Sequence, residues 1–470
     1  MGCSTLCAFA SLREHTMQRC FRTENAAVVN AAREVARALA RAGFQVYFAG
    51  GYVRDTLLGR PLKDVDIATS ATPEQVERLF AGRTVSVGKS FGVILVQHGG
   101  FSFDVATFRT DGAYTDGRHP EQVCFSTPEH DAQRRDFTVN GLFCDPESGE
   151  VIDFVGGVAD MEARLIRAIG DPVARFREDH LRMLRAVRFA SVLGFRLDAD
   201  TREAIARHAE WINRVSAERI ATELVRMLCE SPRPSVGLTL LRETGLLAHT
   251  LPEVAALHGT EQPPQYHPEG DVWMHTCLML DDLPAPRDPD LALGVLFHDI
   301  GKPVTFQVAP DDETIRFPSH APVGAQMAEA ILTRLKLPSE RIAAVTSLVA
   351  EHMHFVDAQK MRKAKLRRFL GGQHFPKMLE LMRLDTTHSN GDFSTWDFLK
   401  TQYDAFTDEP VLPDPRIRGR DLQALGIPPG PAMGKLLAEL YDAQLEGRLE
   451  EEMGKLKSLS CPTALPHAPG

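Results

Sequence analysis

The apolar residues near the start of the chain recur with the two spacings that distinguish helices from strands. In residues 26–43, AAVVNAAREVARALARAG, apolar side chains stand three and four positions apart, which predicts an amphipathic helix, and Gly43 suits a left-handed cap at its end. The next segment, FQVYFAG, predicts a strand. VDIATS predicts a second strand, followed by a helix that Thr72 caps, with Pro73 in its first turn and Gln75 completing a capping box.

Two further predicted strands, GVILVQH and FSFDVATFR, are separated by Gly99 and Gly100, a dipeptide that favours a tight hairpin. We therefore expect residues 25–155 to form an α+β head, with a small mixed sheet flanked by helices.

Helical periodicity fills the rest of the chain. HLRMLRAVRFASVLGF, TREAIARHAEWI and AERIATELVRMLCE each carry apolar residues three and four apart, which predicts an all-α neck. The proline-rich stretch EQPPQYHPEG marks a joint before a second all-α unit that is rich in His and Asp. We expect an N-terminal extension over 1–24, the head over 25–155, the neck over 156–262, the second unit over 263–400, and a helical segment with a disordered tail over 401–470.

The composition is that of a globular protein with several cores, since 43% of its 470 residues are hydrophobic and 25% are charged. No apolar run approaches the roughly 20 residues of a spanning helix, and the first residues lack the pattern of a secretory leader. We therefore expect no membrane partner and a cytoplasmic location. The eight cysteines show no paired C-x-x-C spacing, which argues against a disulfide framework or a structural zinc.

The net charge of −10 hides two basic clusters. Residues 175–188 hold five arginines, and KMRKAKLRRF holds six basic residues, so the acidic total does not exclude an RNA partner. For KMRKAKLRRF, a helix face that is merely solvated and a face that binds phosphates are both open interpretations. The GIPPGP turn further on could offer backbone N–H groups and a helix N-terminus to an RNA phosphate.

Asp64 and Asp66 stand two apart in a predicted strand that follows the pair Gly50 and Gly51. Side chains two apart on a strand point the same way, so the two carboxylates would repel each other unless a cation lay between them. Oxygen ligands at this spacing suit Mg²⁺, which also takes phosphate oxygens and assists phosphoryl transfer in two-metal sites. Asp104, on a neighbouring strand, is the third candidate carboxylate. The competing interpretation is that these are turn or rim residues without a metal.

The glycine pair supports the idea of a nucleotide site. Gly50 and Gly51 let a triphosphate approach the backbone, and Arg54 is expected to be free to pair with its phosphate oxygens.

Four motifs in series, GGYVRDTLLGRPLKDVDIAT, RRDFTVNGL, EDHLRMLRAVRF and SAERIATEL, resemble the class II tRNA nucleotidyltransferase and bacterial poly(A) polymerase family. The resemblance spans about residues 25–250. It implies a polymerase-like head and a helical neck that add nucleotides to an RNA 3′ end without a nucleic-acid template. By this resemblance Gly51 and Arg54 bind the triphosphate, Asp64 and Asp66 hold Mg²⁺, Arg135 and Asp136 lie near the sugar, Asp179 and Arg182 read the base, and Arg185 and Arg188 support that helix and the phosphates.

Two positions depart from the family pattern. Gly141 stands where Ala is common after Asn140, and His119 stands where Arg is common in the loop DGAYTDGRHPEQV. Because this loop takes part in the family's switch from C to A addition, the second departure bears on terminal specificity and not on the chemistry.

The pair Asp179 and Arg182 also has a physical interpretation of its own. Three apart on a predicted helix, the two side chains can address one ligand together. A carboxylate accepts from an exocyclic amine, and a guanidinium donates to a ring nitrogen. C and A offer both partners, whereas U and G would leave buried polar groups unpaired, at a cost of about 1–3 kcal/mol for each group. The alternative is a weak surface salt bridge between the two residues.

The second unit carries WMHT, LALGVLFHDIGKP, RFPSHAPVGAQ, VAEHMHF and MRLD, an order that resembles the HD phosphohydrolase superfamily over about residues 270–390. The helix before His298 is expected to begin with the cap Asp288 and with Pro289, and to stop at Gly301. Mixed nitrogen and oxygen donors suit Mn²⁺, Fe²⁺, Ni²⁺ or Mg²⁺. An active phosphohydrolase and a scaffold stabilised by its metal are both open. The resemblance implies His275, His298, Asp299 and Asp385 as principal ligands and His320 and His352 as extra ones.

These patterns predict a metal-dependent enzyme that adds C and A from CTP and ATP to the tRNA 3′ end, with a phosphohydrolase activity as an open addition. Within the same chemistry, a poly(A) polymerase and an enzyme that adds only A are the alternatives. An alternative of another class is an HD phosphohydrolase whose head only binds RNA, and the intact Asp64 and Asp66 argue against it. The sequence leaves the oligomeric state open.

Overall fold

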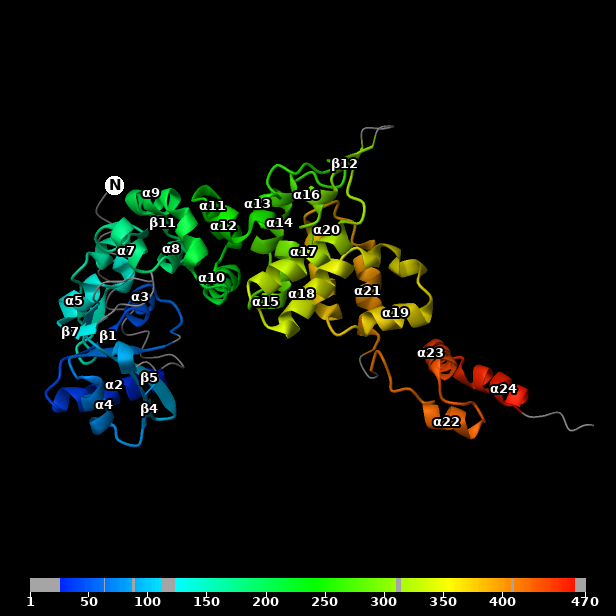
Figure 1. Cartoon of the computed structure of the whole chain (residues 1–470), viewed down its shortest axis with the longest axis horizontal. Coiled ribbons are helices and arrows are strands. Elements are labelled where there is room, and N and C mark those ends of the chain that lie inside the picture. Colours follow the sequence, from blue (N-terminus) through cyan, green and yellow to red (C-terminus); the bar gives the residue numbers. More distant parts are fainter. Residues whose placement is uncertain are drawn as a thin grey trace, which may run out of the picture. The chain divides into compact units, whose positions relative to one another are not determined.

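The chain forms two compact units, Met1–Ala255 and Ala256–Gly470, in this computed structural model (Figure 1). The structure describes residues 26–62, 64–86, 89–111, 123–309, 314–406 and 410–460. The predicted N-terminal extension, His119 with most of its loop, and the predicted disordered tail lie outside the described residues. Within the described ranges, no helix has the length and apolar character needed to cross a membrane.

A seven-stranded mixed sheet with the strand order β3-β4-β5-β2-β1-β8-β9 forms the base of the first unit. The β2 and β5 strands pair in parallel, and the other neighbours in the sheet pair antiparallel. The strands are β1 (Val46–Ala49), β2 (Asp66–Thr69), β3 (Thr84–Val85), β4 (Val93–His98), β5 (Phe101–Thr107), β8 (Phe143–Cys144) and β9 (Val151–Ile152). A separate pair, β6 (Arg109–Asp111) and β7 (Val123–Phe125), lies outside this sheet.

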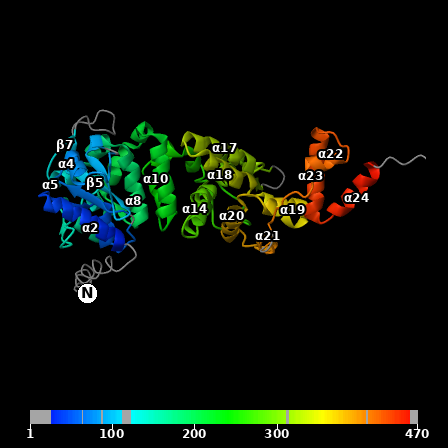
Figure 2. The same cartoon turned by 90° about the horizontal axis from the view of Figure 1, so that it is seen from below.

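Two helices cover one face of this sheet. Both α2 (Ala26–Arg41) and α4 (Pro73–Leu79) contact β4 and β5, and they lie beside these strands in Figures 1 and 2. The amphipathic pattern explains the packing of α2, because Val29, Val35 and Leu39 are fully buried on its inner face. The predicted α+β head with a mixed sheet is confirmed.

The local signals near these helices act as predicted. Thr72 accepts a hydrogen bond from Gln75 N, and the Gln75 side chain accepts one from Thr72 N, which completes the capping box before α4. Gly99 and Gly100 both have positive φ angles, +59° and +82°, and join β4 to β5 in a hairpin in which His98 pairs with Phe101.

The remainder of the first unit is mostly helical, with a short parallel strand pair, β10 (Leu165–Ile166) and β11 (Arg196–Leu197), that the helical periodicity did not predict. The expectation of helix throughout this part is therefore wrong at these two places. Two short helices and the neck helices complete the unit: α3 (Gly51–Leu57), α5 (Pro128–Gln133), α6 (Gly157–Glu162), α7 (Pro172–Glu178), α8 (Leu181–Leu193), α9 (Ala199–Arg207), α10 (Ala217–Glu230), α11 (Pro234–Glu243), α12 (Leu246–Thr250) and α13 (Pro252–Ala255).

The second unit packs α15 and α18 against each other and against α20, with α14 and α17 alongside (Figure 2). Its one departure from an all-α pattern among the described residues is the hairpin of β12 (Gln307–Val308) and β13 (Ile315–Arg316). Its helices are α14 (Val272–Asp281), α15 (Pro289–Phe297), α16 (Lys302–Thr305), α17 (His320–Arg334), α18 (Ser339–Glu351), α19 (Lys363–Leu370), α20 (Phe375–Thr387), α21 (Ser394–Asp404), α22 (Gly419–Ala424), α23 (Pro431–Glu446) and α24 (Leu449–Ser460).

Candidate functional site

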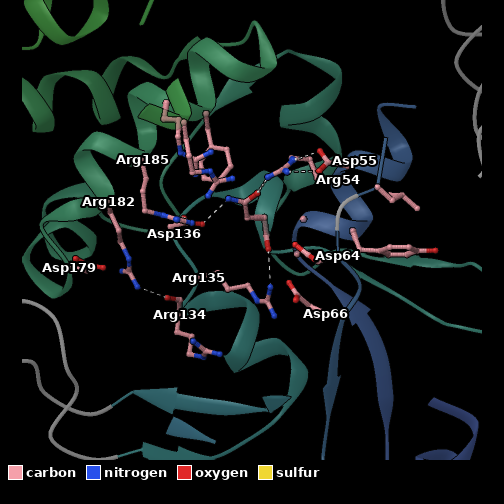
Figure 3. Close-up of a pocket in the computed structure, with 18 residues that line it drawn as sticks. Arg54, Asp55, Asp64, Asp66, Arg134, Arg135, Asp136, Asp179, Arg182 and Arg185 are labelled. Atoms are coloured by element: carbon pink, nitrogen blue, oxygen red, sulfur yellow. Dashed lines mark hydrogen bonds and ion pairs between the residues drawn. The ribbon is translucent and has the colours of Figure 1, made fainter. Parts of the chain in front are cut away.

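A cavity of about 550 Å³ in the first unit gathers almost all of the residues predicted for the head (Figure 3). Its size lies within the usual range for small-molecule sites. Seven arginines and five aspartates line it, and this excess of positive charge favours an anionic ligand. Of the predicted residues, the cavity is lined by Gly50, Gly51, Arg54, Asp64, Asp66, Arg135, Asp136, Asp179, Arg182, Arg185 and Arg188.

Asp64 and Asp66 present their carboxylates to the same cavity (Figure 3). Both residues are exposed, and Val65 between them is buried, which is the alternation of an extended chain. Only Asp66 belongs to β2, however, because the strand begins there and Asp64 precedes it. The expectation that both aspartates lie in the strand is wrong, although their common direction holds.

Asp104 does not line the cavity, but it lies beside Asp66. The β2 and β5 strands pair in parallel with Ile67 opposite Val105, so the two aspartates, each one residue earlier, are neighbours across the pair. Removal of water by the surrounding protein raises the pKa of Asp66; Arg135 opposes this shift, whereas Asp104 and Asp64 add to it. Three neighbouring carboxylates, of which Asp66 has a raised pKa, fit a divalent cation, which would relieve their repulsion.

The turn before α3 requires a glycine at position 50. Gly50 has φ +63°, and a Cβ atom there would lie 2.9 Å from Nη1 of Arg135. Gly50 N donates to Leu142 O at 3.0 Å, which ties the turn to the strand region that follows the RRD motif. The missing side chain therefore lets Arg135 approach the backbone beside Asp66.

Arg54 is not free, contrary to the sequence-based expectation. Its guanidinium donates to both carboxylate oxygens of Asp55, at 2.8 and 2.9 Å, and to Oδ1 of Asn140 at 2.6 Å. Arg54 is nearly buried and stacks 5.1 Å from the ring centroid of Phe189. It lines the cavity as a fixed positive charge whose main hydrogen-bonding groups are already in use.

Asp131 was not predicted, yet it holds both arginines of the RRD motif. Its side chain is 1% exposed; Oδ1 accepts from Arg134 at 2.9 Å, and Oδ2 accepts from Arg135 at 3.1 Å. Arg109 N also donates to Oδ1 at 3.3 Å. A buried carboxylate with three donors fixes the arginines before any ligand arrives. Asp131 stands three and four positions before these arginines, and this helical ion-pair spacing was the sequence signal that could have found it.

Asp136 is the buried partner of Arg185. Its Oδ2 accepts from Arg185 at 2.7 and 2.9 Å, and its Oδ1 accepts from Asn140 at 3.0 Å and from Phe137 N at 2.9 Å. Burial alone would raise the pKa of Asp136, but Arg185 and Asn140 outweigh it and lower this pKa to about 2. The residue is therefore a permanent anion at the cavity wall.

The proposed base-reading pair differs in detail from the prediction. Asp179 ends α7 in an extended conformation and precedes α8, so the two residues do not share one helix. Each has its own ionic partner: Arg219 donates to both Asp179 oxygens at 2.7 and 3.2 Å, and Arg182 contacts Glu178. A salt bridge between Asp179 and Arg182, the alternative interpretation, is therefore wrong. Both side chains still line the same cavity (Figure 3).

Arg188 is 2% exposed and forms an ion pair with the buried Glu223 of α10. Its guanidinium carbon also lies 4.0 Å from the ring centroid of Phe189. Desolvation lowers the pKa of Arg188, and Glu223 opposes this shift. Glu223 and Arg219 both belong to the motif SAERIATEL. Through ion pairs, this motif therefore holds two residues that line the cavity, Arg188 and Asp179.

The second unit brings all six predicted ligands together around Asp299. Its carboxylate lies 3.1 Å from Nε2 of His298, 3.6 Å from Nε2 of His320 and 3.8 Å from Nε2 of His352. Nε2 of His275 lies 3.2 Å from Oδ1 of Asp385. The helix α15 ends at Phe297, so His298 and Asp299 lie just after it. The prediction that this helix continues to Gly301 is therefore wrong.

Three of these histidines are held by their own backbone. Nδ1 of His298, His320 and His352 lies 2.8, 3.0 and 2.7 Å from the carbonyl oxygen three residues earlier. A carbonyl oxygen only accepts, so each Nδ1 carries the hydrogen and each Nε2 is left for another partner. Nε2 of His275 and of His298 is buried without a hydrogen bond, since the close carboxylates lie outside hydrogen-bond geometry. Such orphaned nitrogens beside buried carboxylates fit a metal ion.

The charges of this cluster are strongly perturbed. Burial disfavours charge on His275, but Asp385 and Glu269 outweigh it and raise its pKa to about 9. Burial and the neighbouring His298 lower the pKa of His352 to about 4. Although burial opposes it, the neighbouring His298 and Lys302 hold the pKa of Asp299 well below its usual range. The cluster borders a cavity of about 410 Å³, which Lys302 also lines.

The basic segment KMRKAKLRRF is partly committed to the fold. Arg367 donates to Val411 O at 3.0 Å, and Arg368 donates to Asp442 at 2.8 Å and lies 4.9 Å from the ring centroid of Tyr441. Lys363 and Lys365 are exposed on α19. The two interpretations of this segment thus apply to different residues within it.

Three segments of the chain match known protein families. Residues 46–167 match the poly A polymerase head domain, residues 194–257 match the probable RNA and SrmB-binding site of polymerase A, and residues 271–384 match the HD domain. The chain therefore carries a segment matching the poly A polymerase head, a segment matching the RNA-binding region of polymerase A and a segment matching the HD domain, in this order along the sequence.

The chain is also similar to CCA-adding enzymes. It is 49% identical to those of Geobacillus thermodenitrificans, over 47% of this chain and 54% of the relative, and of Geobacillus kaustophilus, over the same shares. The chain thus spans about half the length of the curated relatives it matches. The Bacillus stearothermophilus CCA-adding enzyme in complex with CTP is 28% identical, with a TM-score of 0.69 over 92% of this chain and 99% of that one. The Thermotoga maritima CCA-adding enzyme complexed with tRNA shares the fold at 20% identity and a TM-score of 0.57, over 91% and 95% of the chains.

Proposed function

We propose that this protein adds C and A from CTP and ATP to the 3′ end of tRNA without a nucleic-acid template. The observation that carries the proposal is the convergence of Asp64 and Asp66 on an arginine-rich cavity that also holds Asp179 and Arg182. Relatives at 49% identity named as CCA-adding enzymes support it, as does the related structure solved with CTP.

The residues of the cavity divide the work of binding. Asp64 and Asp66, with Asp104 beside them, would hold Mg²⁺, which when bound neutralises the triphosphate and lowers the pKa of the attacking hydroxyl. Arg135, held in place by Asp131, faces the phosphates beside the Gly50 turn. Asp179 and Arg182 accept from and donate to the base edge that C and A share.

Asp136 and the arginines behind it complete the assignment. Asp136 faces the sugar, and Arg185 holds its carboxylate in one orientation. Arg188, buried against Glu223, supports α8 and adds positive potential near the phosphates. Arg54 contributes positive charge, and because three of its five N–H groups already donate to Asp55 and Asn140, we assign it a supporting role.

The test uses the purified protein, tRNA that lacks its terminal triplet, and each labelled nucleoside triphosphate in turn. We expect C and then A to be incorporated and U and G to be refused. Long A tails would favour a poly(A) polymerase, A alone would favour the A-adding enzyme, and no incorporation would favour an RNA-binding head on a phosphohydrolase. Asp66→Asn should lose several kcal/mol of transition-state stabilisation, on the order of 10³ in rate, while Asp200→Asn, an exposed control on α9, should not change it.

A second function is favoured by the buried histidine cluster of the HD domain. His275, His298, Asp299 and Asp385 would hold a divalent metal, which supplies an activated water for phosphoester hydrolysis, and Lys302 would attract the phosphate. Hydrolysis of a 2′,3′-cyclic phosphate by the parent and by His298→Ala tests it, together with metal analysis that distinguishes Mn²⁺, Fe²⁺, Ni²⁺ and Mg²⁺. Equal rates would leave a scaffold whose metal only stabilises the fold. A cytoplasmic location and the five-part division of the chain stay part of the proposal.

A further inference from the structure

His275 is the exception among the four histidines around Asp299, because its ring is not held by the carbonyl three residues earlier. Its Nδ1 lies 2.6 Å from Oε1 of Glu269 and 3.1 Å from the carbonyl oxygen of His388. Since both partners only accept when Glu269 is ionised, Nδ1 carries the hydrogen. Nε2 then points to the centre, 3.2 Å from Asp385.

Glu269 comes from the proline-rich stretch before α14, outside the helices that supply the other groups. Its side chain is 9% exposed, and the same oxygen, Oε1, also accepts from Nδ1 of His267 at 2.9 Å. The other oxygen, Oε2, is buried without a hydrogen-bond partner. One carboxylate therefore holds two imidazole rings whose centroids lie 5.0 Å apart, and His267 lines the same cavity as Asp299.

We propose that Glu269 is a positioning residue of the HD metal centre, which fixes the ring of His275 so that Nε2 is offered to a divalent metal. This inference rests on the metal centre proposed above. A carboxylate behind a ligating histidine sets its tautomer and orientation and raises its basicity, and loss of such a partner typically costs about 10–100-fold in metal affinity. His298, His320 and His352 do not need such a partner, because their backbone provides it.

The experiment measures the binding of Co²⁺ to the full-length chain by calorimetry and by its visible spectrum. Asp64→Asn and Asp66→Asn are present in every variant, so that the head carboxylates do not take up the ion. We expect Glu269→Ala to weaken binding roughly 10–100-fold and to alter the spectrum of the bound ion. Glu269→Gln keeps the size and one acceptor oxygen and should fall between Glu269→Ala and the parent. Glu261→Gln, an exposed carboxylate in the same stretch, should bind like the parent.

A double-mutant cycle separates positioning from a general effect on the fold. If Glu269 acts through His275, Glu269→Ala should cause no further loss of affinity in a His275→Ala background. Additive losses, or an unchanged affinity in both Glu269 variants, would overturn the inference. If the Glu269 variants instead bind one Co²⁺ ion fewer per chain and bind the remaining ions with unchanged affinity, Glu269 is itself a metal ligand. The inference of a positioning role would then be wrong.

The failure of the underlying metal centre gives a different result. If His298→Ala binds Co²⁺ as the parent does, no metal centre exists at Asp299, and the proposed hydrolase function falls together with this inference. Melting curves without metal identify any variant that fails to fold, in which case the isosteric Glu269→Gln decides alone.

Discussion

Asp136 and Arg185, 49 residues apart in the chain, form an ion pair with two hydrogen bonds. Nε and Nη2 of Arg185 donate to the same carboxylate oxygen, Oδ2 of Asp136, at 2.9 and 2.7 Å. The pair joins the RRD motif to α8, the helix that carries Arg182 and Arg188. It thereby links two of the segments that line the cavity of the first unit.

Removal of the charge at Asp136 should destabilise this part of the protein. Asp136→Asn leaves Arg185 with only the more distant Glu223, 3.6 Å away, and breaking one side of a buried pair typically costs about 3–5 kcal/mol. The free energy of unfolding in urea measures this effect. Glu147→Gln, which breaks the half-exposed pair with Arg37, is the matched control and should cost less than about 1 kcal/mol.

The same pair predicts how stability depends on pH. The pKa of Asp136 is about 2 in the folded protein, below the ordinary value of 3.8, so its contribution is complete above about pH 4 and is lost as the pH falls toward 2. The parent should therefore lose on the order of 2 kcal/mol relative to Asp136→Asn over this interval. A stability difference between the two proteins that stays constant from pH 5 to pH 2 would contradict the ionised state of Asp136.

Base selection should depend on Arg219 although this residue does not line the cavity. Arg219 holds both oxygens of Asp179, so Arg219→Gln should free that carboxylate to rotate and should relax the preference for CTP over UTP by about tenfold. The ratio of kcat/KM values for the two nucleotides measures it. Arg214→Gln, an exposed arginine nearby in the chain, serves as the control, and a normal preference in Arg219→Gln would show that Asp179 needs no such support.

Gly141, one of the two departures from the family pattern described above, is explained by its surroundings. A Cβ atom at this position would lie 2.6 Å from Cγ2 of Val155 and 3.2 Å from Cδ1 of Ile169. Gly141→Ala should therefore cost roughly 1–3 kcal/mol through overpacking, and the added substitution Val155→Ala should recover part of the loss. Gly434→Ala, in α23 with open space around its Cβ, should instead stabilise by about 0.5–1 kcal/mol, as measured by thermal unfolding.

On the basic helix α19, the exposed lysines and the paired arginine should affect tRNA binding differently. Lys363→Gln and Lys365→Gln should each weaken tRNA binding and lower the slope of log affinity against log salt by about 1, if these exposed residues contact phosphates. Arg368→Gln should leave that slope unchanged and loosen α23, because Arg368 is paired with Asp442. Unchanged affinity in both lysine variants would mean that this helix face is only solvated.

Features that depend on neighbours in sequence were predictable. The capping box of Thr72, the hairpin at Gly99 and Gly100, and the common direction of Asp64 and Asp66 follow from local rules, and all appear in the structure. The extended conformation of Asp179 between two helices was missed because α7 and α8 follow each other so closely that the pattern reads as one helix.

Features that depend on distant residues were not predictable. Arg54 is occupied by Asn140 across 86 positions and Asp179 by Arg219 across 40, and no spacing rule links such residues. Asp131 and Glu269 were missed for another reason: each carboxylate contacts predicted side chains, Arg134 and Arg135 for Asp131 and His275 for Glu269, but belongs to none of the motifs itself. The ligands of a site are thus easier to find in a sequence than the residues that orient them.

The backbone-held rings of His298, His320 and His352 have a consequence for how the HD centre matures. Each ring is oriented by a carbonyl only three residues away, so its geometry is complete once the local helix end has formed. A divalent ion bound at the proposed centre would therefore need little reorganisation of these three rings. On this proposal the folded protein would exchange its ion without unfolding, and the bound cation would depend on which cations the cell supplies.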